Sequence, residues 1–381
     1  MLTNQKHLFQ LPDEITYLNG SYMAPQLRSV EEVGIRELQK KATPYVISEN
    51  DFFSEKKRLK ERFAQLIECA DPECIAIIPS VSYGIATLIK NIEFEKGDEI
   101  VLLQEQFPSN YYAWKQLEIE RGVVLKTVMA PELEVGRAER WNEAVLESIS
   151  SKTKVVAMPH VHWADGTLFN LKQIRKRTLE EGAYLIIDGT QSVGAMPFSV
   201  TEIQPDALIC GGYKWLLGAY GLGLAYFGEH FHKGIPIENN WMNHEGSENF
   251  SNLVNYNENF KAKATRYDVG ESSNFILTPM LSEAIRQLLE WTPAARQEYC
   301  RSITQDALQH LSPKDYFVED PKFRSHHLFG IYPKNDISIA QFKERLSSKN
   351  IVVSYRGNAI RVSPNVYNTT NDIEKLVSCF L

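Results

Sequence analysis

The chain has 381 residues, enough for two domains with a sizeable core; 43% of the residues are hydrophobic and 23% are charged. This balance is typical of a folded globular protein and excludes a disordered one. The net charge of −7 argues against nucleic acid as a partner, because phosphate binding needs a basic face. No apolar stretch approaches the roughly 20 residues of a membrane span, and residues 1–10 lack a long apolar core. We therefore expect neither a membrane partner nor a secretory signal.

The cysteines and histidines favour a reduced protein without a metal. None of the five cysteines forms a Cys-x-x-Cys pair, so reduced thiols in a cytoplasmic protein fit better than a disulfide framework. The pairs His160–His162 and His230–His232 lack acidic or cysteine ligands at the spacing of a metal site. The cysteines are Cys69, Cys74, Cys210, Cys300 and Cys379.

Strand patterns alternate with helical patterns through the first 228 residues. Apolar runs predict strands, and apolar residues spaced three and four apart predict helices. The alternation is typical of an α/β fold with a mostly parallel, doubly wound sheet. The expected strands are 15–20 with its turn, 75–78, 99–103, 123–128, 154–158, 184–188, the apolar run after Asp206, and 222–227. The expected helices are 54–69, 85–92, 111–121 and 171–181.

The pattern changes after residue 228. Residues 229–265 are polar and rich in asparagine, and so long a loop in a compact enzyme is usually functional or covers a neighbour. We predict a large cofactor-binding domain over 16–265 and a smaller α+β domain formed by 1–15 and 266–381. The later elements are expected helices at 278–291, 294–311, 338–348 and 370–380, and expected strands at 329–332, 351–354 and 359–362.

Lys214 and Asp188 are the most informative pair in the chain. Each follows a buried apolar run, and they are separated by about one strand–connection–strand unit. Two such strands would bring an amine and a carboxylate to the same sheet edge, where ligands bind in open α/β sheets. Either residue alone is most simply a solvated lysine or a helix-capping aspartate. Together they suit pyridoxal 5'-phosphate (PLP), because the amine can hold the cofactor aldehyde as a Schiff base and the carboxylate can keep the pyridine nitrogen protonated.

Three further segments are expected at the same edge. Ser82 and Tyr83 join a strand to a helix whose N-terminus could bind a phosphate, although a serine there can be an ordinary helix cap. Phe107 follows the next strand and could stack on a flat ring, or be a core residue. Gln191 could donate a hydrogen bond to a phenolic oxygen of such a ring.

On these residues the chain resembles the class V branch of fold-type I PLP enzymes. This branch includes class V aminotransferases, cysteine desulfurases, selenocysteine lyases, isopenicillin N epimerase-like proteins and kynureninases. The resemblance covers roughly residues 15–381 and rests on Asp188-Gly-Thr-Gln191 followed by Tyr213-Lys214. It implies Lys214 as the Schiff-base lysine, Asp188 as the partner of the pyridine nitrogen, Gln191 as the contact to the ring hydroxyl, Phe107 as the stacking residue, and Ser82, Tyr83 and Tyr213 as phosphate-binding residues.

Two later segments imply a homodimer with shared active sites. The stretch from Trp241 to Glu245 resembles a kynureninase segment whose Trp reaches the cofactor phosphate across a dimer interface. The stretch from Arg266 to Ser272 resembles a family segment that makes the same contact. Because Glu271 stands where the family usually has Thr, Ser272 is the candidate there. Arg361 lies in a segment similar to the family's substrate-carboxylate strand and would bind an α-carboxylate.

The resemblance implies a PLP-dependent enzyme that acts on an α-amino acid or related amine. A class V aminotransferase is the preferred interpretation. Kynureninase-like or selenocysteine-lyase-like chemistry and a non-catalytic PLP-fold protein are the alternatives. Between Arg356 and Arg361 the chain lacks the cysteine that desulfurases carry, which argues against persulfide formation there. Trp163 stands where desulfurases have Asn. A nicotinamide dehydrogenase is excluded because no Gly-x-Gly-x-x-Gly opens the first strand–helix turn.

Overall fold

A computed structural model describes residues 2–334 and 339–381 of the chain. The strands of its largest sheet are β2 (Ile75–Ile78), β3 (Glu99–Leu103), β4 (Val124–Val128), β5 (Thr153–Pro159), β6 (Tyr184–Asp188), β7 (Ala207–Gly211) and β8 (Gly223–Phe227). They lie in the order β2-β8-β7-β6-β5-β3-β4. β8 runs antiparallel to both neighbours, whereas the pairings from β7 to β4 are parallel. The predicted mostly parallel sheet is confirmed.

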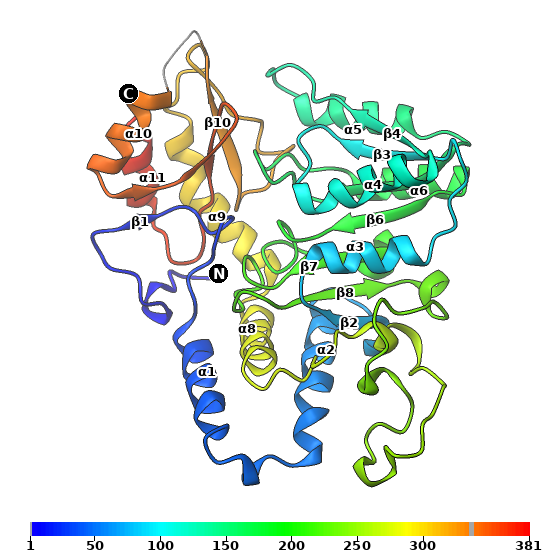
Figure 1. The fold of residues 1–381 in the computed structure, drawn as a ribbon. Coiled ribbons are helices and arrows are strands. Elements are labelled where there is room, and N and C mark those ends of the chain that lie inside the picture. Colours follow the sequence, from blue (N-terminus) through cyan, green and yellow to red (C-terminus); the bar gives the residue numbers. More distant parts are fainter. Residues whose placement is uncertain (1, 335–338) are drawn as a thin grey trace.

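Helices cover both faces of this sheet (Figure 1). One face carries α3 (Val81–Lys90) and α4 (Tyr112–Arg121), which pack with Ile186 and Ile209. Successive strand residues point to opposite faces, so Ile187 and Leu208 pack with the helices of the other face. Those helices are α2 (Ser54–Leu66), α5 (Arg137–Ser148), α6 (Leu171–Glu181) and α8 (Leu277–Trp291), and the short α7 (Val200–Ile203) follows β6. The doubly wound arrangement is therefore confirmed.

The C-terminal part forms a smaller α+β layer, as expected. An antiparallel sheet has the order β12-β13-β10-β9, with β9 (Tyr316–Phe317), β10 (Phe329–Pro333), β12 (Ser354–Arg356) and β13 (Ala359–Val362). Its helices are α9 (Pro293–Leu308), α10 (Ile339–Ser348) and α11 (Thr370–Val377). The short strand β11 (Ile351–Val352) pairs in parallel with β1 (Thr16–Tyr17) near the N-terminus.

The N-terminal segment connects the two parts of the molecule. After β1 pairs with the C-terminal part, α1 (Arg28–Lys40) and α2 both point toward the lower end of Figure 1, where residues 41–53 connect them. Both helices contact α8. The proposed domain boundaries at 15/16 and 265/266 stay a prediction.

Most expected elements are found, with a few differences in extent. α3 begins at Val81 rather than 85, because the Ser80 hydroxyl accepts the Tyr83 N–H and caps the helix. The strand expected at 351–354 is divided into β11 and β12. The helix expected over 338–348 is α10, and residue 338 lies outside the described residues. Within the described ranges, every helix is too short or too polar to span a bilayer.

Candidate active site

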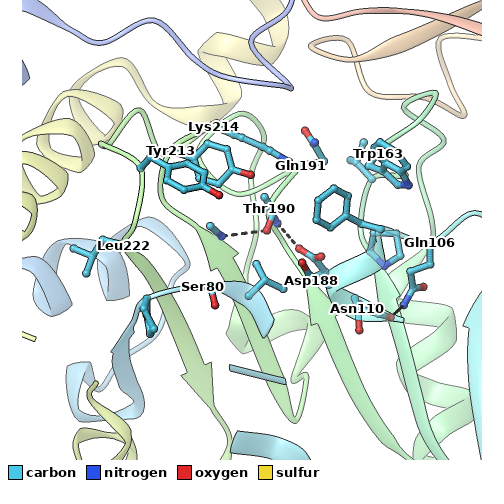
Figure 2. Close-up of a pocket in the computed structure, with 18 of the residues that line it drawn as sticks. Ser80, Gln106, Asn110, Trp163, Asp188, Thr190, Gln191, Tyr213, Lys214 and Leu222 are labelled. Atoms are coloured by element: carbon cyan, nitrogen blue, oxygen red, sulfur yellow. Dashed lines mark hydrogen bonds between the residues drawn. The ribbon is translucent and has the colours of Figure 1, made fainter. Parts of the chain in front are cut away.

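A cavity of about 220 Å³ opens at the carboxyl ends of the parallel strands. Segments that follow β2, β3, β5, β6 and β7 form its wall, as is typical of ligand sites in open α/β sheets. Figure 2 shows Lys214 above and Asp188 below its centre in that view. The lining residues are Pro79, Ser80, Val81, Gln106, Phe107, Ser109, Asn110, Pro159, Val161, Trp163, Asp188, Thr190, Gln191, Gly211, Tyr213, Lys214, Tyr220, Gly221 and Leu222.

Asp188 is the last residue of β6 and is buried at the floor of the cavity. Its Oδ1 accepts the backbone N–H of Thr190 at 3.0 Å, and the Thr190 hydroxyl accepts the N–H of Gly211 on the neighbouring strand at 3.1 Å. Burial raises the pKa of the Asp188 carboxyl, while the Thr190 hydrogen bonds and the charge of Lys214 oppose this shift. A further cation in the cavity would therefore stabilise the carboxylate.

Lys214 follows β7 through a tight turn. The Gly212 N–H donates to the Leu222 carbonyl at 2.9 Å, and a Cβ at position 212 would lie only 2.5 Å from that oxygen. The turn thus requires glycine. Lys214 Nζ lies 4.9 Å from the ring centre of Phe107 and 5.4 Å from that of Tyr213. Burial lowers the Lys214 pKa to about 8, opposed by the charge of Asp188. The amine can therefore lose its proton near neutral pH.

Phe107 and Trp163 form an aromatic wall beside Lys214. Phe107 lies after β3 and Trp163 after β5, and their rings pack edge to face with centres 5.3 Å apart. Trp163 Nε1 donates to the carbonyl of Glu105 at 2.6 Å. This bond fixes the indole ring, so the wall offers one aromatic face near the amine and another toward the C-terminal part of the chain.

Gln191 and Tyr213 line the cavity and are held by their neighbours. Gln191 Nε2 donates to the Ser21 carbonyl at 3.1 Å, and Gln191 Oε1 accepts from Trp215 Nε1 at 2.8 Å. An amide carries two N–H groups, so the second N–H of Gln191 can donate a hydrogen bond to a ligand. Tyr213 packs on Tyr220 with ring centres 4.6 Å apart. Burial raises the Tyr213 pKa to about 12, and its phenol therefore stays a hydrogen-bond donor at neutral pH.

Ser82 and Tyr83 lie in the first turn of α3 but do not line the cavity. Ser80 does line it, and its hydroxyl lies 2.9 Å from that of Ser82 and accepts the Tyr83 N–H at 3.3 Å. Burial, with a contribution from Glu238, raises the Tyr83 pKa. The helix N-terminus therefore meets the cavity through Ser80 and Val81.

Trp241 and Ser272 lie outside the cavity of their own chain. Trp241 begins the 3-10 helix η7 (Trp241–Asn243), and it packs against the aromatic rings of Phe52, Phe53 and Phe250. Ser272 is fully buried, and its hydroxyl has no hydrogen-bond partner in the described part of the chain. Their neighbours Met242 and Ser273 are in contact at 3.8 Å, so the two segments belong to one region.

Arg361 is fully buried on β13, beyond Trp163. Its Nε donates to the Ser354 hydroxyl at 2.8 Å and its Nη1 to the Trp163 carbonyl at 2.9 Å. Nη2 is buried without a partner among residues 2–334 and 339–381. Burial lowers the Arg361 pKa to about 9, as does the charge of Arg356. Arg361 does not itself line the cavity, but its charge lowers the pKa of Lys214.

Known proteins resemble the chain over most of its length. The family description "Aminotransferase class-V" matches residues 48–376. The chain belongs to this family. It is 24% identical over 319 residues to the uncharacterized aminotransferase YcbU of Bacillus subtilis (strain 168). The aligned region covers 84% of this chain and 81% of YcbU.

Solved structures share the fold of this class V chain. The cystine C-S lyase C-DES, in complex with its product cysteine persulfide, superposes with a TM-score of 0.83 and 17% identity, over 96% of this chain and 97% of that one. The cysteine desulfurase CsdA from Escherichia coli gives a TM-score of 0.79 and 18% identity, over 98% and 96%. The expected family and fold-type I architecture are thereby confirmed.

Membership in the class V family implies PLP as the cofactor. The residues around the cavity fit that group, because a buried amine, a buried carboxylate and an aromatic ring face one space. A protonated ring nitrogen would offset the cost of burying the Asp188 charge. In the described ranges, no group of three or more His, Cys, Asp or Glu side chains is arranged to hold a metal.

The class V site also contains residues that the motifs did not single out. Thr190 orients Asp188, Trp215 orients Gln191, and Tyr220 packs on Tyr213. Thr190 lies within the Asp188–Gln191 motif, so it could have been identified from the sequence alone. Trp215 and Tyr220 are recognisable only once the turn between β7 and β8 is folded.

Proposed function

We propose that this chain is a PLP-dependent enzyme that acts on an α-amino acid or related amine through Lys214, and that its reaction is amino transfer. The observation that carries the proposal is that Asp188 ends β6 and Lys214 follows the neighbouring strand β7, so that both line one cavity. The family description and the name of the relative YcbU, which both refer to aminotransferases, support the choice of reaction.

Each residue of the cavity has a separate task in this proposal. When bound, PLP supplies an aldehyde that condenses with amines and a ring that accepts electrons. Lys214 would hold the aldehyde covalently, yield to the substrate amine, and then move the α-proton as general acid and base. Its pKa of about 8 suits that work. Asp188 would keep a proton on the ring nitrogen, Gln191 would donate to the ring hydroxyl, and Phe107 would stack on the ring.

The cofactor phosphate would lie at the N-terminus of α3, where free N–H groups and the helix dipole attract an anion. Ser82, Tyr83 and Tyr213 are the candidates on the same chain. Trp241 and Ser272 lie away from their own cavity, which supports a homodimer in which each chain completes the phosphate site of the other. The unpartnered Ser272 hydroxyl is consistent with such a contact.

Arg361 would bind the α-carboxylate of the substrate. Its guanidinium has a buried N–H group without a partner in the described ranges, and a planar guanidinium matches a carboxylate with two parallel hydrogen bonds. The effect of its charge on Lys214 supports its position near the reacting amine.

Lyase or hydrolase chemistry is the second candidate, because Phe107 and the stretch from Trp241 to Glu245 resemble kynureninases. Desulfuration through a loop cysteine is disfavoured, although some relatives are named probable cysteine desulfurases. Only Gly357 and Asn358 separate β12 from β13, so the hairpin has neither a thiol nor a loop to carry one.

Borohydride reduction tests the central assignment. The purified protein should be yellow, and reduction should fix PLP on a peptide that contains Lys214. Lys214→Ala should abolish turnover and keep PLP through its phosphate contacts. Label on another lysine would overturn the assignment. A panel of amino acids, with product identification, then separates keto acids formed by amino transfer from the fragments of a lyase reaction.

A further inference from the structure

Arg356 and Arg361 lie on the same face of the β12–β13 hairpin. Ser354 pairs with Arg361, and Arg356 pairs with Ala359. Residues two apart on a strand share a face, so Arg356 is the diagonal neighbour of Arg361. The hairpin therefore presents two guanidinium groups together.

Both guanidinium groups contact the ring of Trp163, which lines the cavity. The Arg356 group lies 5.0 Å from the centre of the Trp163 ring and the Arg361 group 5.7 Å from it. The charges of both arginines act on Lys214 and lower its pKa. Neither arginine lines the cavity itself, but both contact Trp163, which lines it and packs against Phe107.

These two cations have no carboxylate partner in the part of the chain that the structure describes. In residues 2–334 and 339–381 neither arginine forms an ion pair with a carboxylate, although 20 ion pairs occur elsewhere in the described chain. Arg361 Nη2 and Arg356 Nε are buried without hydrogen-bond partners, and Arg356 Nη1 donates only to the carbonyl of its neighbour Tyr355. Buried charges are normally paired. Arg361 is fully buried and Arg356 half-buried, and an amino acid with a neutral side chain brings an anion for only one of them.

We propose that Arg356 binds a second anionic group on the substrate, so that the preferred substrate is an α-amino acid with an acidic side chain. This inference rests on the proposed function, in which Arg361 binds the α-carboxylate. Trp163 acts as a spacer, because its ring contacts both guanidinium groups and its carbonyl holds Arg361. A carboxylate on each arginine would satisfy the free N–H groups and neutralise the pair.

Binding of non-reacting acids tests the proposal independently of turnover. Succinate and its monoamide, succinamate, have nearly the same shape, but only succinate carries two negative charges. Calorimetric titration of the PLP-loaded protein should give a dissociation constant about 10- to 100-fold lower for succinate, as expected for a charged hydrogen bond. Equal dissociation constants would overturn the proposal.

Variants assign the preference to Arg356. Arg356→Gln should bring the two dissociation constants within about threefold of each other, since the second anion loses a charged hydrogen bond, and Arg356→Lys should restore part of the difference. Lys343→Gln is the matched control: it removes a cation that lies over the Tyr355 ring of the same hairpin, and the preference should persist. A preference that survives in Arg356→Gln with an unchanged melting temperature would overturn the role of Arg356.

The two proposals fail in different ways. If borohydride labels another lysine while succinate binding still depends on Arg356, the proposed function is wrong and the dianion site stands. If Lys214 carries the cofactor and aspartate and glutamate bind no better than asparagine and glutamine, the acidic-substrate inference is wrong and the proposed function stands.

Discussion

Burial moves the pKa of Lys214 down to about 8 and the pKa of Asp188 up. Both shifts have the same cause, because each group loses the water that stabilises its charged form. The consequences differ. The lysine becomes a better nucleophile and proton acceptor near neutral pH, whereas the aspartate becomes a site that favours a cationic neighbour. Two groups with opposite tasks can thus share one small cavity.

The pH dependence of Lys214 follows from this shift. In cofactor-free protein, trace acetylation of Lys214 should rise with pH around a midpoint near 8, rather than about 10.4 as for a free lysine. The neutral amine is the nucleophile, so reactivity is low below the midpoint and constant above it. Mass spectrometry of the Lys214 peptide, normalised to an added reference peptide, gives the profile. A midpoint near that of free lysine would mean that the amine is hydrated.

Asp188→Asn should keep the fold and the cofactor but lose turnover. The amide has the size of the carboxylate, yet it cannot hold a proton on the ring nitrogen. We expect kcat to fall about 100- to 1000-fold, as when an electrostatic contact in an active site is removed. Steady-state kinetics with PLP content measured in parallel checks this. Asp206→Asn is a suitable control, since Asp206 pairs with Arg175 outside the cavity. Comparable turnover of both variants would count against the role of Asp188.

At the scale of elements, the loop after β5 fixes how the cavity wall meets the C-terminal part. Gly166 has a φ of +78°, and a Cβ there would lie 1.9 Å from the Leu328 carbonyl oxygen. Its own carbonyl accepts the Ser325 N–H at 3.0 Å. The backbones of the loop and of the segment before β10 touch directly, and this contact lies three residues from Trp163.

Gly166→Ala should therefore destabilise the protein much more than Gly182→Ala. Gly182 has a φ of +71° with open space around its Cβ position, so alanine there costs about 1 kcal/mol of backbone strain. The same strain applies at 166, and displacement of the Leu328 backbone should add about 2 kcal/mol or more. Urea unfolding of both variants measures the difference. Equal losses would mean that the loop moves freely against Leu328.

The sequence was sufficient for most elements and not for α1 and α5. Buried strands such as β6 and β7 are continuous apolar runs, and α6 and α11 begin at side-chain caps, Asn170 and Thr369. α1 and α5 have no side-chain cap hydrogen bond, so the cap signal that marks the starts of α6 and α11 is absent there.

Some residues of the candidate site could likewise be predicted from the sequence, and others could not. Residues at strand ends, such as Asp188 and Phe107, could be placed from the pattern because parallel strands share an edge. The position of Arg356 beside Trp163 depends on how the hairpin docks on the large sheet, and no local pattern encodes that contact.

At the scale of the whole molecule, two segments project from the end that carries α1 and α2 (Figure 1). The turn between these helices exposes Tyr45 and Val46, and the polar segment after η7 exposes Val254 and Tyr256. The aromatic contacts of Trp241 with Phe52 and Phe53 hold the two segments together. Large exposed apolar side chains gathered on projecting segments are typical of a protein–protein interface, and they support the proposed homodimer.

Subunit mixing tests the shared active site. Lys214→Ala and Trp241→Ala should each be inactive as a pure protein, the second because the phosphate contact from the neighbouring chain is lost. In a symmetric dimer each site combines residues of both chains, so a hybrid of the two variants contains one site with both Lys214 and Trp241 intact. Unfolding and refolding the variants together in equal amounts should restore about a quarter of wild-type activity, since half of the dimers are hybrids with one intact site. Refolding each variant alone is the control. If Trp241 served its own chain, each of the two sites in the hybrid would carry one defect, and mixing would restore no activity.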